Sequence, residues 1–120
     1  MATSENQWFG VRCVFGQSKN QPWGPHDLRD GEYAYEERIT LWQADSADRA
    51  IALAEEEAHL YEEQILVEYL GIAQCYRLGD VIGAGAEVFS LVRKSNLEPG
   101  PYLDAFFDTG SEYQAPFDKP

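Results

Sequence analysis

The feature that most constrains this fold is an alanine-rich segment, residues 45–63, with its charges gathered on one side. When successive residues are placed 100° apart, the apolar ones fill one arc and the charged ones the opposite arc. Half of the apolar arc is alanine, and its larger side chains are Ile51, Leu53, Leu60 and Tyr61. Ser46 is the expected N-cap, and Asp48 suits the positive end of the helix dipole. The segment therefore predicts an amphipathic helix that lies close against a sheet.

Four other segments are interpreted as strands because they alternate or are rich in β-branched and aromatic residues. They are residues 8–15, 33–43, 65–78 and 86–93. Residues 16–31 are rich in Pro, Gly and polar residues and predict a loop, and a short helix is expected to start at Pro99 and end at Gly110. The predicted fold class is α+β, in the order β-β-α-β-β-α. It has a four-stranded, mainly antiparallel sheet with the long amphipathic helix packed on one face.

The chain length of 120 residues fits one core and is too short for two. We predict a single domain over residues 8–110, flanked by a flexible N-terminus at residues 1–7 and a flexible tail at residues 111–120. The first, third and fourth predicted strands carry large apolar side chains on both faces, but the long helix covers only one face. The other face is expected to be covered by the short helix, by a second subunit or by another protein.

The charge of the chain is strongly negative, with 21 acidic and 9 basic residues and a net charge of −12. Nucleic acids and anionic membranes require clustered Lys and Arg, so we expect neither as a partner. Residues 45–68 hold eight acidic residues and one basic residue, Arg49, and so carry −7 of that charge. This face either attracts a basic protein or only keeps the chain solvated.

The candidate partner-binding residues are one loop aromatic and five residues of the charged helix arc. They are Trp23, Glu55, Glu56, His59, Glu62 and Glu63. Trp23 stands in a turn stiffened by two prolines, where its ring either contacts a partner or folds back onto the core.

Two glutamates depart from the pattern of outward charge. Glu37 shares a strand face with apolar residues, and Glu57 lies inside the apolar arc of the helix. A buried carboxylate needs a partner or a raised pKa. The strand arginines Arg12, Arg38 and Arg77 are the candidates for such pairs. The alternatives are structural ion pairs or an inner polar site for a small ligand or acid–base chemistry, formed by Arg12, Glu37, Glu57 and Arg77.

Motifs for catalysis, metal binding or cofactor binding are missing from the sequence. Without C-x-x-C or H-E-x-x-H we expect neither metal nor cofactor, and an exposed face explains the helical spacing of Glu55, His59 and Glu63. Cys13 and Cys75 are expected to be free buried thiols. No apolar run reaches about 18 residues, and the first seven residues do not form a signal peptide, so we expect a cytoplasmic protein.

Six motifs occur in order between about Trp8 and Glu112. They are WFGVR, YEERITLW, SADRAIALAEEEA, YLGIAQCYRL, EVFSLVR and YLDAFFDTG. Together they resemble a bacterial family of small uncharacterised domains, domain of unknown function 4288. The resemblance implies a stand-alone bacterial cytosolic domain, and it implies no reaction, ligand or catalytic residue.

These observations favour a non-enzymatic protein-binding module, in the manner of bacterial immunity or antitoxin proteins, that uses the acidic helix face. The first alternative is a homodimer that packs through the second sheet face, with a small-ligand pocket. The second alternative is a carboxylate-based hydrolase that uses Glu37 and Glu57.

Overall fold

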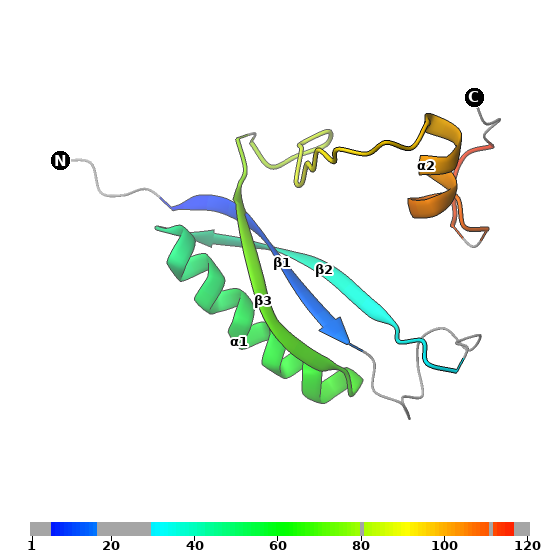
Figure 1. Cartoon of the computed structure of the whole chain (residues 1–120). Helices are drawn as coiled ribbons and strands as arrows, with labels where there is room; N and C mark the ends of the chain where they lie inside the picture. Colours follow the sequence, from blue (N-terminus) through cyan, green and yellow to red (C-terminus); the bar gives the residue numbers. More distant parts are fainter. Residues whose placement is uncertain (1–5, 17–29, 80, 111, 117–120) are drawn as a thin grey trace. The chain divides into compact units, whose positions relative to one another are not determined.

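The computed structural model describes residues 6–16, 30–79, 81–110 and 112–116. The chain divides into two compact units, Met1–Ser90 and Leu91–Pro120, and each is described by itself (Figure 1). The predicted loop around Trp23 and most of the predicted flexible N-terminus lie outside the described residues. The prediction of a single domain over residues 8–110 stays a prediction.

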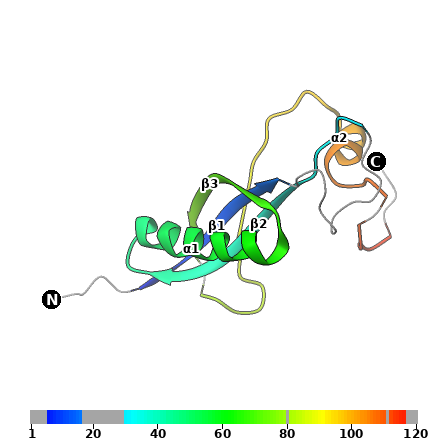
Figure 2. The same cartoon turned by 90° about the horizontal axis from the view of Figure 1, so that it is seen from below.

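The first unit is a three-stranded antiparallel sheet with one helix across it. Its strands are β1 (Gln7–Gly16), β2 (Tyr35–Ala44) and β3 (Glu68–Arg77), in the order β2-β1-β3. The helix α1 (Ala47–Ile65) connects the two outer strands and runs along one face of the sheet (Figures 1 and 2). We call the opposite side of the sheet the open face. It carries Gly10, Arg12 and Val14 of β1 and, by register, Glu37, Ile39 and Leu41 of β2.

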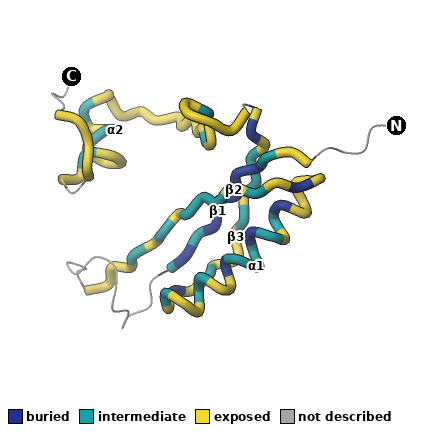
Figure 3. Tube along the Cα trace, turned by 180° about the vertical axis from the view of Figure 1, so that it is seen from behind, coloured by how far each residue is buried: buried dark blue, intermediate teal, exposed yellow. Residues whose placement is uncertain are grey.

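The core lies between α1 and the sheet. From β1 it takes Phe9, Val11, Cys13 and Phe15, the four residues that the alternation places on one side. From α1 it takes Ala50, Ala54 and Ala58, which are almost fully buried, and Figure 3 shows buried positions recurring along both elements. Because alanine ends at Cβ, the helix axis can approach the sheet closely. The prediction of an alanine-faced helix against a sheet is confirmed.

Both ends of α1 are capped by recognisable signals. The Ser46 hydroxyl accepts a hydrogen bond from the Arg49 backbone N–H at 3.1 Å, as an N-cap should. The helix ends at Leu66, a left-handed residue (φ 64°) whose N–H donates to the Glu62 carbonyl at 2.9 Å. It runs two residues past the predicted end, so β3 starts at Glu68 rather than at residue 65.

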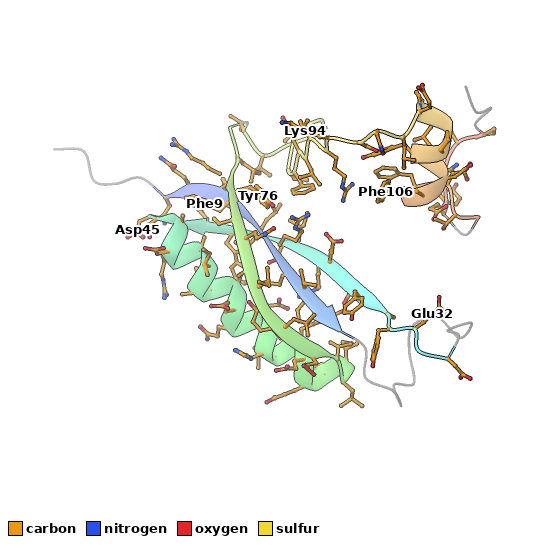
Figure 4. The ribbon with its side chains drawn as sticks, in the orientation of Figure 1. Phe9, Glu32, Asp45, Tyr76, Lys94 and Phe106 are labelled. Carbon is orange, nitrogen blue, oxygen red and sulfur yellow. The ribbon has the colours of Figure 1, made fainter. Side chains whose placement is uncertain are left out.

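The predicted fourth strand, residues 86–93, is wrong, and with it the four-stranded sheet and the order β-β-α-β-β-α. The observed order is β-β-α-β-α. Residues 86–90 instead lie over one end of the open face, where the Val88 carbonyl oxygen is 3.1 Å from where a Cβ on Gly10 would stand. The Phe89 ring packs edge-on against Tyr76 at 5.0 Å (Figure 4 labels Tyr76). The Phe89 ring is partly covered there, so the segment packs on the face of the sheet and does not pair with a strand edge.

β3 is bent by a bulge where its pairing with β1 shifts, between Cys13 and Phe15. In this interval, between the pairs Cys13–Ala73 and Phe15–Tyr69, β1 has one residue, Val14, and β3 has three, residues 70–72. Gly71 lies inside it with φ +84°, a conformation that favours glycine.

The second unit contains α2 (Pro99–Phe106), which confirms a short helix that starts at Pro99 but ends at Phe106 rather than at Gly110. Proline occupies its first turn, where the missing N–H costs nothing. The Tyr102 ring contacts those of Phe106 and Phe107, with centroids 4.9 and 5.9 Å apart.

Candidate functional site

Glu57, the charged residue inside the apolar arc of α1, is held by Arg38 of β2. The guanidinium donates to both carboxylate oxygens, at 2.6 and 2.9 Å, and it lies 3.9 Å from the centroid of the Tyr61 ring. The two side chains are only 28% and 31% exposed. The hydrogen bonds to Glu57 raise the pKa of Arg38, although burial opposes this shift. This is a bidentate, partly desolvated ion pair between helix and sheet.

Glu37 pairs with a different arginine, on the open face. Arg12 donates to the Glu37 carboxylate at 3.1 Å and to the Gln74 side-chain oxygen at 2.6 Å. The rings of Phe89 and Tyr76 lie 5.0 and 5.9 Å from the Arg12 guanidinium carbon. The Arg12 Nε is buried and has no hydrogen-bond partner within the described part of the chain. This arginine therefore contacts residues of all three strands and the ring of Phe89.

The four residues of the predicted inner polar site do not come together. Residues 37 and 38 are neighbours in β2, so their side chains point to opposite faces, and Arg38 meets Glu57 on the helix side. Arg77, at the far end of β3, has no ion pair among the residues described and lines a cleft of about 220 Å³ with Tyr76 and Phe89. Glu37 and Glu57 therefore share no pocket in which acid–base chemistry could occur.

The charged arc of α1 bears the other candidate residues. We call Asp48, Glu55, Glu56, Glu62 and Glu63 together the acidic surface. Asp48, Glu56 and Glu63 are exposed, whereas Glu55 and Glu62 are half-buried. None of the five forms an ion pair with a Lys or Arg that the structure describes.

Two carboxylates of the acidic surface are fixed by Tyr69 of β3. The Tyr69 hydroxyl donates to Glu55 at 2.7 Å, and its backbone N–H donates to Glu62 at 2.7 Å. Burial, and then the bond to Glu55, raises the pKa of Tyr69. The pKa of Glu62 is lowered by the Tyr69 N–H and by His59, whose Nδ1 lies 3.3 Å from the carboxylate. These contacts hold two negative charges in set positions beside the exposed ones.

The two cysteines are free. Both lie on the helix side of the sheet in neighbouring strands, but Cys13 faces Ala73 and Cys75 faces Val11, which makes them diagonal neighbours. Cys13 is buried and burial raises the pKa of its thiol, whereas Cys75 is half-buried. Among the described residues, no three His, Cys, Asp or Glu side chains are grouped to hold a metal ion.

Sequence reasoning missed the part played by Tyr69. The signal was present, because alternation places Tyr69 on the face of β3 that carries Ala73 and Cys75, and a flat small-residue face suits a close helix. A tyrosine on such a face has its hydroxyl at the rim of the helix, where the acidic residues are.

A comparison with family models, curated proteins and solved structures gave no match. The chain is therefore defined here by its fold and surface: a β-β-α-β unit with an acidic helix, followed by a short helical unit. Membership of domain family 4288 stays a prediction. No helix in the described part of the chain is both long and apolar enough to cross a membrane.

Proposed function

We propose that the protein is a non-enzymatic binding module that recognises a basic protein through the acidic surface of α1. The observation that carries this proposal is the uncompensated charge of that surface. The described residues of the first unit include four arginines and no lysine, and two of these arginines, Arg12 and Arg38, are engaged in internal ion pairs. The negative electrostatic field of the acidic surface is therefore directed at the solvent, where it attracts a basic partner.

The contacts made by Tyr69 support a binding role over simple solvation. A carboxylate held in place loses little side-chain freedom when a partner binds, so less of the interaction energy is lost to ordering. Glu55 and Glu62 are held in this way, and the exposed Glu56 and Glu63 stand beside them on the same arc. Such an arrangement gives electrostatic steering together with two oriented hydrogen-bond acceptors.

The proposal is tested with a lysine-rich peptide as probe, titrated against the protein at low and high salt. We expect binding that weakens as salt rises, and a loss of about tenfold or more for Glu56→Lys/Glu63→Lys. The control is Glu68→Lys/Glu98→Lys, which changes the net charge equally at two exposed residues outside the acidic surface. Equal weakening by both double variants would show attraction to net charge alone and would contradict the proposal.

The cytoplasmic location and the resemblance to family 4288 belong to the same proposal. A partner of immunity or antitoxin type would be encoded nearby, so the genomic neighbourhood is an independent test. Recovery of no partner from the host at either low or high salt would count against the proposal.

A second candidate, a homodimer that packs through the open face, is favoured by a separate observation. Tyr35, Leu41, Leu70 and Ile72 are large apolar residues that lie exposed. Residues 86–90 cover only the end of the open face near Gly10 and Arg12, where the cleft lined by Tyr76 and Phe89 gives space for a small ligand. Sedimentation that finds a monomer, together with no binding of a hydrophobic dye, would remove this candidate.

A further inference from the structure

The outer edge of β2 is an unbroken row of backbone donors and acceptors. All ten residues of β2 pair with β1 in one continuous register, from Gln7 opposite Ala44 to Gly16 opposite Tyr35. Within the described chain no other strand adjoins β2, and no backbone hydrogen bond outside the sheet and helices reaches it. The edge contains no proline, lysine or bulge, the usual devices that prevent further pairing. β3, the other edge strand, is blunted by its bulge at Gly71.

The charged side chains of β2 do not prevent another strand from pairing with this edge, because each of them already has a partner in the same chain. Of the three charged residues of β2, Arg38 is bound to Glu57, Glu37 to Arg12, and Glu36 accepts a hydrogen bond from the Tyr61 hydroxyl at 2.7 Å. From Ile39 to Ala44 the strand carries no charge. An incoming strand therefore meets no free charge along the second half of β2.

The sequence of β2 is complementary to itself when two copies run antiparallel with Thr40 at the centre. Facing side chains then lie on the same side of the joined sheet, and each residue meets a compatible one. Thr40 faces Thr40, Ile39 faces Leu41, Arg38 faces Trp42, Glu37 faces Gln43 and Glu36 faces Ala44. A shift by two residues in one direction puts Ile39 at the centre and sets Glu37 against Leu41. Further shifts in that direction oppose Arg38 to Arg38 and then Glu37 to Glu37.

We propose that β2 is a self-association edge, on which β2 of a second copy pairs antiparallel about Thr40 to form a continuous six-stranded sheet. The two-fold axis is perpendicular to this sheet, so both α1 helices lie on the same side. The interface is made of backbone hydrogen bonds along the edge. It differs from a dimer that packs through the open face, and no residue of the acidic surface forms part of it.

The first test is sedimentation of the full chain and of two matched variants. Leu41 on β2 and Ile72 on β3 are similarly exposed, at 41% and 49%, and flank the sheet on opposite edges. We expect a dimer for the wild type, at least about tenfold weaker dimerisation for Leu41→Lys, and no such loss for Ile72→Lys. If the wild type is a monomer at about 100 μM, the proposal is wrong, because an interface that is useful in a cell gives a dimer at that concentration. Equal loss in both variants also overturns it and supports an open-face dimer.

The second test fixes the register and remains valid if Leu41→Lys fails to fold. Directly facing residues of an antiparallel pair are about 4.5–5.5 Å apart between Cα atoms, which is within reach of a disulfide. Thr40→Cys should therefore form a covalent dimer under mild oxidation, whereas the wild type, with its free Cys13 and Cys75, and Ile72→Cys should not. Crosslinking of Ile72→Cys without crosslinking of Thr40→Cys would refute pairing at β2.

Discussion

Removal of Glu57 tests whether the ion pair between α1 and β2 stabilises the fold. Breaking a fully buried pair costs about 3–5 kcal/mol, and an exposed pair contributes about 0–1 kcal/mol. The Arg38 and Glu57 side chains are 28% and 31% exposed, so the pair lies between these two cases. When the carboxylate is lost, the Arg38 guanidinium still stacks on the Tyr61 ring. We therefore expect Glu57→Ala to lower the free energy of unfolding by about 2 kcal/mol.

The matched control is Glu56→Ala, at the adjacent exposed position on the same helix, which forms no ion pair with the residues that the structure describes. It undergoes the same change in helix propensity, so the difference between the two variants reports the pair alone. Urea denaturation measures the free energies, and a thermal melt should show Glu57→Ala about 10 °C below the control. The double variant Arg38→Met/Glu57→Ala should regain much of the loss, because it leaves no charge without a partner. A Glu57→Ala variant within about 0.5 kcal/mol of Glu56→Ala would refute the reasoning.

Three further substitutions probe the contacts around the sheet. The Tyr69 N–H lowers the pKa of Glu62 below 4.5, so its stabilisation is present above that pH and lost as the pH falls through the folded value. Glu62→Gln should therefore flatten the acid limb of a plot of unfolding free energy against pH, and an unchanged limb would contradict this. Tyr69→Phe removes the bond to Glu55 and should cost about 1–2 kcal/mol in urea denaturation; no loss would show that water replaces the bond. Gly10→Ala places a Cβ 3.1 Å from the Val88 carbonyl, so hydrogen exchange should rise in the segment around Val88 while α1 stays protected; unchanged exchange there would show that the segment yields without detaching.

The long helix and the first strand could be predicted from the sequence because their signals are local. Ser46 caps α1 as its type and position indicate, and the alternation of β1 identifies the four side chains that enter the core. The prediction of a strand at residues 86–93 was wrong because the contact that decides their structure is not local. Their apolar content is compatible with a strand or with a segment that lies across a sheet, and only the presence of Gly10 beneath Val88 decides between them. That contact joins residues far apart in the sequence.

In the candidate site, too, the features set by local patterns could be predicted, and those set by contacts distant in the sequence could not. The position of Glu57 in the apolar arc predicted a need for a partner, and alternation placed Arg38 and Glu37 on opposite faces of β2. Which of those faces meets the helix is set by the pairing of β2 with β1, and no local pattern reports it. The register therefore selects Arg38 for Glu57 and leaves Glu37 to Arg12.

Salt separates the two proposed interactions, because the sheet has three strands in the described part of the chain and β2 lies at its edge. Pairing two copies at that edge sets both α1 helices on one side of the joined sheet. Their acidic surfaces then repel each other, and at a net charge of −12 per chain this repulsion opposes association most strongly at low ionic strength. Self-association through β2 should therefore strengthen as salt is added, whereas binding of a lysine-rich peptide to the acidic surface should weaken. Sedimentation and peptide titration over the same salt series measure the two trends. If dimerisation weakened with salt in parallel with peptide binding, the dimer would be held by charge pairs, and the largely uncharged β2 edge would not be its interface.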